Sequence, residues 1–163
     1  MIENRDATIN DIKEIKKIYN EAVLKTNATF DINKKTDEDM KKWFKGHKTK
    51  NPIIVSVKER RIIAFASLSK YDDKKAYENT SELSLYVLKG HQGKGIGKKL
   101  MKDILKKGKE VGIHAVIARI TKGNKISIHL HESFGFEKIG TLKEVGKKFG
   151  KVLDVHIFEK VLS

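Results

Sequence analysis

The segment "LKGHQGKGIGKKL", residues 88–100, places four glycines and four lysines between an apolar run and an amphipathic run. Glycine permits left-handed backbone and lets the chain approach a ligand closely. A strand that turns through such a loop into a helix directs the free N–H groups of the helix start at one point. The pattern therefore predicts an anion cradle suited to a pyrophosphate, and a plain glycine-rich turn is the alternative.

Two common nucleotide motifs do not fit this loop. A P-loop reads GxxxxGK followed by Ser or Thr, but the sixth position counted from Gly93 is Lys98. Counted from Gly90, Gly95 falls in sixth place and Ile96 follows where lysine is required. A dinucleotide fingerprint reads GxGxxG after a first strand, whereas "GKGIG" has its third glycine one residue early and follows a predicted hairpin.

Hydrophobic periodicity predicts seven strands and four helices in one domain over residues 1–163. We expect caps at Asn10 or Asp11, at Thr36 and at Asn124, and a hairpin turn at Glu59–Arg60. The order strand, two helices, three strands, helix, strand, helix and two strands indicates an α+β fold with a mixed, largely antiparallel sheet. The predicted strands are 7–9, two in 52–69, 81–89, 114–121, 136–145 and 151–161, and the helices are 11–23, 36–44, 97–108 and 124–134.

Composition narrows the function classes. Cysteine is absent, and the six histidines show no HExxH spacing, so we expect neither thiolate chemistry nor a metal. There is no signal-peptide core and no run of about 18 apolar residues, so we expect a cytoplasmic protein without membrane contact.

The net charge of +14 is dispersed along the chain, and aromatic residues make up 7%. This favours a solvated surface over a specific nucleic-acid partner, although a basic binding module for nucleic acid or an acidic protein stays open as the alternative function.

The loop and four other segments resemble a known family. The pattern Q/RxxGxG/A of the GNAT N-acetyltransferases runs here from Gln92 to Gly97, and "NKISIHLHESFGFEKIG" resembles its downstream partner. "IYNEAVLKTNATFD", "AYENTSELSLYV" and "GKKFGKVLD" are similar to the phosphinothricin and methionine sulfoximine acetyltransferase branch. The resemblance covers the chain from end to end. It implies a GNAT fold, acetyl-CoA as cosubstrate, a small amine acceptor and a homodimer.

The resemblance also implies which residues contact acetyl-CoA. The strand before the loop offers its backbone groups to the pantetheine arm, as an added strand would, and the loop N–H groups bind the pyrophosphate. Asn124 and Ser133 lie along the same arm, with a helix cap and a surface position as their alternative roles. The residues expected to contact acetyl-CoA are Leu85, Tyr86, Val87, Gln92, Gly93, Lys94, Gly95, Ile96, Gly97, Lys98, Asn124 and Ser133.

Acetyl transfer requires a neutral amine that attacks the thioester carbonyl to form a tetrahedral intermediate. Glu82 is the candidate base, since alternation on "SELSLYV" places it on one face with Ser84 and Tyr86. A solvent-facing strand glutamate is the alternative. His131 stands where many GNAT proteins have tyrosine, so it is a candidate proton donor to the departing thiolate, or a residue of the pocket wall.

The branch usually carries an arginine pair in the loop before the Glu82 strand, to hold an anionic acceptor. Asp72 and Lys74 occupy those positions here, and lysine lacks the bidentate fork of arginine. We therefore expect a singly anionic acceptor to be preferred over phosphinothricin. The candidate acceptor residues are Phe30, Lys74, Lys75, Tyr77, Lys148 and Phe149.

Overall fold

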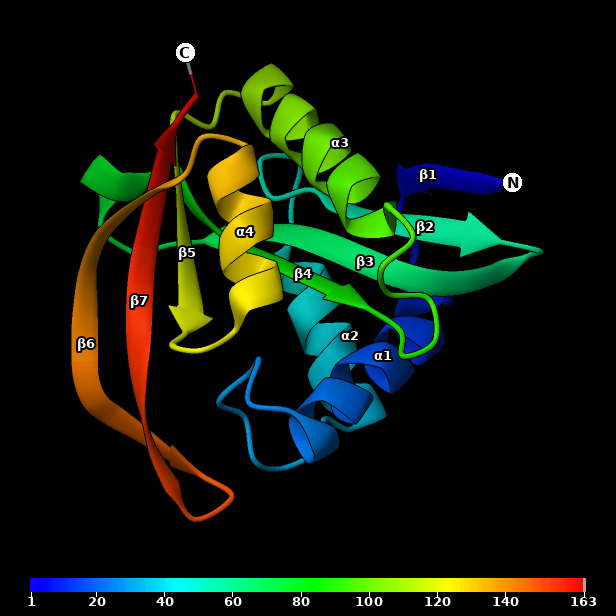
Figure 1. Ribbon diagram of the computed structural model, residues 1–163. Helices are drawn as coiled ribbons and strands as arrows, with labels where there is room; N and C mark the ends of the chain where they lie inside the picture. Colours follow the sequence, from blue (N-terminus) through cyan, green and yellow to red (C-terminus); the bar gives the residue numbers. More distant parts are fainter. Residues whose placement is uncertain (163) are drawn as a thin grey trace.

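The computed structural model describes residues 1–162 as one seven-stranded sheet with four helices (Figure 1). The strand order is β1-β2-β3-β4-β5-β7-β6, and β4–β5 is the parallel pair in an otherwise antiparallel sheet. The predicted α+β class and the order of its elements are confirmed. The strands are β1 (Ile2–Asp6), β2 (Ile53–Lys58), β3 (Arg61–Lys70), β4 (Thr80–Val87), β5 (Ala115–Thr121), β6 (Glu137–Lys148) and β7 (Lys151–Val161), and the helices are α1 (Ile12–Lys25), α2 (Asp37–Gly46), α3 (Ile96–Glu110) and α4 (Lys125–Ser133).

Two apolar cores lie on opposite faces of the sheet. Helices α1 and α2 cover one face through residues such as Ile15 and Met40, which pack with Phe65 of β3. Helix α3 covers the other face, where Leu100 and Ile104 are fully buried. Figure 1 shows α3 on the side of β3 away from α1 and α2. Burial on both faces explains why β3 reads as a nearly continuous apolar run.

The local signals that were predicted for turns and caps are mostly confirmed. The Asp39 N–H donates to Thr36 Oγ1 at 3.1 Å, and the Thr36 N–H donates to the Asp39 carboxylate at 2.8 Å. The Ser127 N–H donates to Asn124 Oδ1 at 3.2 Å. Glu59 and Arg60 both have positive φ, at 50° and 66°, as a tight two-residue hairpin requires.

The predicted first strand at residues 7–9 is wrong. The strand is β1, at Ile2–Asp6, and residues 9–11 form a short 3₁₀ turn. The Asp11 carboxylate accepts the Thr8 N–H at 2.7 Å and holds Arg5 in an ion pair at 2.7 Å, which stabilises the turn. Because β1 is a polar edge strand, its sequence "IENRD" carries little hydrophobic alternation to reveal it.

The central strands separate partway along their length. Strands β4 and β5 pair only at Thr80–Ala115, Ser81–Val116 and Glu82–Ile117. Both strands continue beyond these pairs, while β4 stays paired with β3 as far as Val87. One backbone edge of β4 is therefore left without a strand partner after Glu82, and this separation opens the functional cleft. Within residues 1–162, no helix is both long and apolar enough to cross a membrane.

Candidate active site

A cleft of about 1540 Å³ opens where β4 and β5 separate. Its walls are β4, β5, the glycine loop, α4 and residues 26–31, which follow α1. We call the part at the glycine loop, the start of α3 and residues 85–87 the donor end. We call the part at Glu82, Arg119 and residues 26–31 the acceptor end. The two ends meet along β4, so groups held at each end face a common space.

The glycine loop adopts the backbone that its composition predicts. Gly90, Gly93 and Gly95 have φ of 92°, 75° and 80°, where side chains with a Cβ are strained. Gly95 is the N-cap of α3 and provides no side chain to bond the first helical N–H groups. A Cβ added at Gly93 or Gly95 meets no atom of the described residues within 4 Å. Open space beside free helix-start N–H groups fits a bound phosphate.

The remaining glycine of the loop has a packing role. A Cβ at Gly97 would meet Leu130 of α4 at 3.4 Å and Leu85 of β4 at 4.0 Å, so this position brings α3, α4 and β4 close together. Gln92 then fastens the loop to the end of β4, because its Nε2 donates to the Val87 carbonyl at 3.2 Å. The loop is thus fixed to the strand whose edge is open.

Most residues predicted to contact acetyl-CoA line this cleft, and two do not. Lys94 is exposed outside it, and the Ser133 hydroxyl is exposed and donates to the Leu130 carbonyl at 2.7 Å. Asn124 lines the cleft while its side chain caps α4. The residues from that prediction that line the cleft are Leu85, Tyr86, Val87, Gln92, Gly93, Gly95, Ile96, Gly97, Lys98 and Asn124.

Glu82 is held by an arginine that the sequence analysis did not single out. Arg119 Nε donates to Glu82 Oε2 at 2.6 Å, and Arg119 Nη2 donates to Oε1 at 2.8 Å. The Glu82 side chain is 24% exposed and that of Arg119 is 60% exposed, and both line the cleft. The hydrogen bond to Glu82 raises the pKa of Arg119. The sequence signal that could have pointed to Arg119 is its position as the single charged residue within the apolar strand "HAVIARIT".

His131 is buried in the wall formed by α4, with 5% of its surface exposed. Its Nδ1 lies 2.7 Å from the Ser127 carbonyl, and a carbonyl only accepts, so Nδ1 carries the proton. Burial lowers the pKa of His131, with the Ser127 carbonyl opposing the shift. A neutral imidazole protonated on Nδ1 presents an acceptor at Nε2. The local geometry therefore favours a wall residue or proton acceptor over a proton donor.

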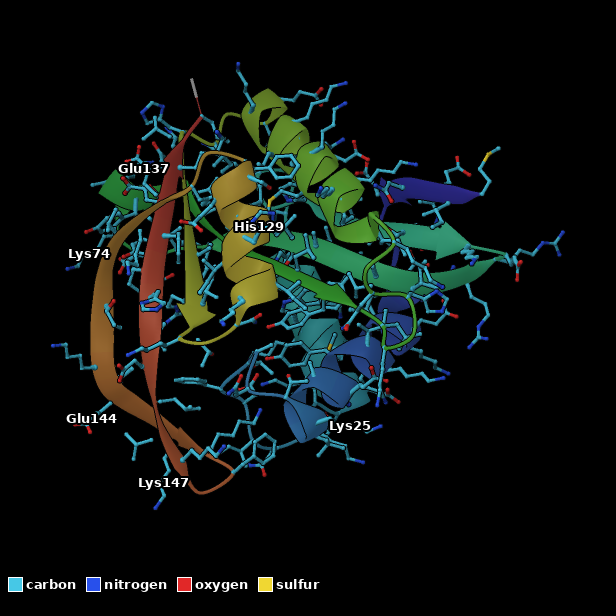
Figure 2. All side chains as sticks on the ribbon, in the orientation of Figure 1. Lys25, Lys74, His129, Glu137, Glu144 and Lys147 are labelled. Atoms are coloured by element: carbon cyan, nitrogen blue, oxygen red, sulfur yellow. The ribbon has the colours of Figure 1, made fainter. Side chains whose placement is uncertain are left out.

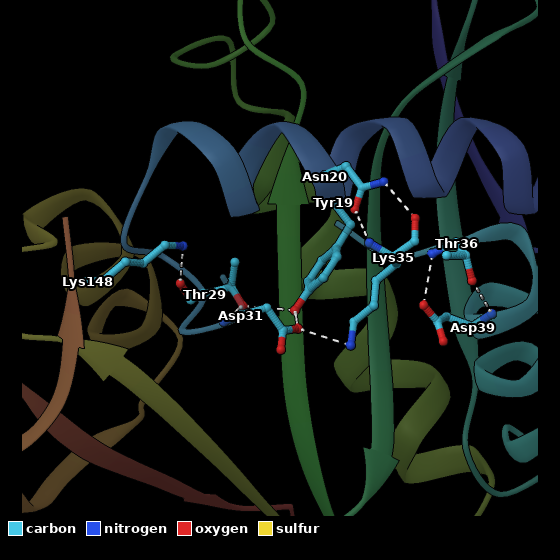
Figure 3. Close-up of polar contacts among 8 residues, drawn as sticks. All are labelled: Tyr19, Asn20, Thr29, Asp31, Lys35, Thr36, Asp39 and Lys148. Atoms are coloured by element: carbon cyan, nitrogen blue, oxygen red, sulfur yellow. Dashed lines mark hydrogen bonds and ion pairs between the residues drawn. The ribbon is translucent and has the colours of Figure 1, made fainter. Parts of the chain in front are cut away.

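Residues 26–31 are held at the acceptor end by a polar network (Figure 3). Tyr19 bonds the Thr29 hydroxyl at 2.8 Å and donates to the Asp31 carboxylate. Lys148 Nζ donates to the Thr29 carbonyl at 2.8 Å from the tip of the β6–β7 hairpin. The Phe30 ring then lies against Gly146, where an added Cβ would approach ring carbons within 2.1 to 2.9 Å. Phe30 lines the cleft, in the position expected of an aromatic wall.

The other predicted acceptor residues lie outside the cleft. Lys74 and Tyr77 are exposed, and Figure 2 shows Lys74 directed outward at the periphery. The Lys75 ammonium lies 3.7 Å from Glu78. Asp72 also lies outside the cleft, and its carboxylate accepts the Lys74 N–H at 2.8 Å. Because this loop turns back on itself, it directs no cation into the cleft of this chain.

Lys148 and Phe149 line a separate small cavity of about 170 Å³ beside the end of α1. Lys148 is 5% exposed, and burial lowers its pKa although Asp31 opposes the shift. Its ammonium lies 5.3 Å from the centre of the Phe149 ring. Lys148 does not line the main cleft, and its bond to the Thr29 carbonyl indicates that it supports the wall formed by residues 26–31.

The family follows from this geometry together with comparison to known proteins. A family model described as an acetyltransferase (GNAT) domain matches residues 5–157. The chain belongs to the GNAT acetyltransferase family and is an acyltransferase. The separated central strands and the glycine loop at the start of α3 both lie within the matched residues.

Relatives within the family narrow the resemblance to one branch. The phosphinothricin N-acetyltransferase of Streptomyces coelicolor is 32% identical, with coverage of 99% of this chain and 96% of that protein. An L-methionine sulfoximine/L-methionine sulfone acetyltransferase of Pseudomonas paraeruginosa is 33% identical, with coverage of 93% and 89%. A phosphinothricin acetyltransferase from Sinorhizobium meliloti, solved in complex with acetyl-CoA, superposes with a TM-score of 0.95 at 32% identity and covers 99% of this chain and 89% of that one.

Proposed function

We propose that this protein transfers the acetyl group of acetyl-CoA to the primary amine of a small amino-acid-like acceptor. The observation that carries the proposal is the single cleft that joins an open strand edge, an anion-binding loop and a carboxylate. The names of the similar proteins, which act on phosphinothricin or on methionine sulfoximine and methionine sulfone, support an acceptor of this size and type.

The donor end has the groups that acetyl-CoA needs. Its pyrophosphate would accept hydrogen bonds from the N–H groups around Gly93 and Gly95, with Lys98 nearby. Its pantetheine arm would pair with the free backbone edge of β4 at residues 85–87. These contacts are made by backbone, so they hold the arm in register and direct the thioester toward Glu82.

The acceptor end has the groups that prepare the amine. Glu82 takes a proton from the acceptor ammonium, directly or through water, and the neutral amine then attacks the thioester carbonyl. A backbone N–H at the strand separation stabilises the oxyanion of the tetrahedral intermediate. Tyr86 is not the base, because burial raises its pKa to about 12 and keeps its hydroxyl protonated. Collapse of the intermediate releases the thiolate of coenzyme A, which takes its proton from water or from the protonated amine.

The test is acetyl-CoA-dependent thiol release with a panel of amino acids and simple amines. We expect saturable acetyl-CoA binding and acetylation of at least one small amino acid. Because the loop at residues 72–75 provides no arginine and directs no cation into the cleft, methionine sulfoximine and methionine sulfone should be acetylated more efficiently than the more highly charged phosphinothricin. No binding of acetyl-CoA, or turnover only with protein or nucleic-acid-associated acceptors, would contradict the proposal.

We also propose that the chain forms a homodimer. Strand β6 is an edge of the sheet, and the exposed faces of β6 and β7 carry several large apolar side chains, which suits an interface. These exposed residues are Ile139, Leu142, Val145, Val152 and Val161. Light scattering at micromolar concentration should give the mass of two subunits, and the mass of one subunit would contradict this proposal.

A further inference from the structure

The Glu82–Arg119 pair presents two opposite charges side by side at the acceptor end. Resting on the proposed function, we propose that Arg119 determines specificity by binding the carboxylate of a zwitterionic α-amino acid whose amino group lies at Glu82. The acceptor class is then the free α-amino acid, and amines without an adjacent carboxylate are poor acceptors.

The guanidinium has donors left for this contact. Arginine carries five N–H groups in a planar fork, and Glu82 uses one on Nε and one on Nη2. Among the hydrogen bonds of residues 1–162, the Nη1 group of Arg119 has no partner in the protein. The side chain is 60% exposed and lines the cleft, so these N–H groups are accessible to a ligand there. A second carboxylate can therefore be bound without breaking the pair with Glu82.

The spacing of the two charges matches an amino-acid head group. The ammonium and carboxylate of an α-amino acid are separated by one carbon, and the carboxylate and guanidinium of the pair are in direct contact. The head group can thus align with its ammonium toward Glu82 and its carboxylate toward Arg119, so that both charges are paired. This alignment delivers the amine to the same carboxylate that takes its proton.

The other cations that line the cleft in the described part of the chain are less suited to this role, because none of them forms an ion pair with Glu82. Lys89 and Lys98 flank the glycine loop at the donor end, Lys25 is the last residue of α1, and Lys122 lies 3.8 Å from Asp154. The lysines at positions 74, 75 and 148 lie outside the cleft. Within residues 1–162, Arg119 is the only cation that forms an ion pair with Glu82. Anion binding, which the family resemblance assigned to the loop at residues 72–75, is therefore supplied by β5.

A simpler role for Arg119 is to hold Glu82 in place, and a matched pair of acceptors separates the two roles. L-Methionine sulfone and 3-(methylsulfonyl)propan-1-amine differ only in the carboxylate, as do L-phenylalanine and 2-phenylethylamine. Any change in Glu82 alters the acetylation of both members of a pair. Loss of a carboxylate contact alters only the amino acid, so the ratio of the two kcat/KM values isolates that contact.

The experiment compares this ratio in the wild type, Arg119→Ala and Arg119→Lys, with Lys122→Met as the control for removal of a cation from the cleft. We expect the wild type to prefer the amino acid, and Arg119→Ala to lower the ratio roughly 10- to 100-fold, the scale of a lost charged hydrogen bond. Arg119→Lys keeps the positive charge but lacks the planar fork of the guanidinium, so its ratio should fall between those of the wild type and Arg119→Ala. Lys122→Met should leave the ratio near that of the wild type.

Acetyl-CoA affinity, measured on every variant, reports whether the fold and the donor end are intact. An unchanged ratio in Arg119→Ala, with both acceptors slowed equally, would overturn the inference and leave Arg119 as a positioning residue for Glu82. Wild-type turnover of the amines but not of their amino acids would also overturn it while the transferase function stands. Failure of the wild type to bind acetyl-CoA would instead reject the proposed function itself.

Discussion

The two ends of the cleft are built in different ways. The donor end is a contiguous segment in which backbone conformation at Gly93 and Gly95 and the open edge of β4 do the binding. The acceptor end assembles side chains from α1, residues 26–31, β4, β5 and the β6–β7 hairpin. The donor end should therefore be sensitive to a few glycines and tolerant elsewhere, whereas the acceptor end should respond to single changes in any of several distant segments.

The largest effect should come from Gly95→Glu at the donor end. Its φ of 80° penalises a side chain by about 1–2 kcal/mol, and the added carboxylate repels the pyrophosphate. We expect acetyl-CoA affinity to fall roughly 10²- to 10³-fold in isothermal titration. Gly150→Glu is the control, since Gly150 has φ of 74° and an open surrounding at the hairpin tip. Equal acetyl-CoA affinities of Gly95→Glu and the wild type would show that the glycine loop does not bind acetyl-CoA.

Glu82→Gln tests the chemistry at the junction of the two ends. The change keeps the size of the side chain but removes the carboxylate that takes the proton. We expect kcat to fall about 10²-fold at neutral pH, the usual scale for loss of a general base, with little change in acetyl-CoA affinity. Glu78→Gln, outside the cleft, is the control. A rate unchanged between pH 6 and pH 9 would show that another group or water is the base.

Gly146→Ala should affect the acceptor end alone. Its Cβ would lie within 2.1 to 2.9 Å of the Phe30 ring, which must then move. Overpacking of this kind costs about 1–3 kcal/mol, so we expect the acceptor KM to rise roughly 10-fold with acetyl-CoA affinity unchanged. Gly140→Ala on the same strand, with no atom within 4 Å of its Cβ, should leave both constants near wild type. A similar KM for both variants would show that Phe30 is not a wall of the acceptor site.

The smallest effect concerns pH and the wall formed by α4. Burial lowers the pKa of His131, so the unfolded chain binds a proton first as the pH falls below about 6.5. Stability should therefore be full above that pH and should decline as the pH falls toward the folded-state pKa, by at most about 1.4 kcal/mol per pH unit for one proton. In urea unfolding, His131→Gln should flatten this slope. Equal slopes for the wild type and His131→Gln would contradict the attribution of this pH dependence to His131.

The sequence predicted the conformation of the glycine loop and most of the fold because both depend on local signals. The loop glycines, the Thr36 and Asn124 caps and the Glu59–Arg60 turn act within a few residues of one another. The acceptor end was predicted less well. The resemblance placed Lys74 in the pocket, but this residue sits in a loop closed by the Asp72 carboxylate.

Arg119 was missed for a related reason. It lies 37 positions from Glu82 in the chain, and it meets Glu82 only because β4 and β5 run parallel and then separate. No pattern within either strand records that register. Side-chain pairs of this kind become visible only when the order of strands in the sheet is known.

The bond from Lys148 to the Thr29 carbonyl joins positions 119 residues apart. Closing so long a chain segment costs more conformational entropy than closing a local turn or the loop at residues 90–95. The wall of the acceptor end is therefore fastened by a contact between the two ends of the chain, so a change at either end of the chain can reach the acceptor without touching the glycine loop.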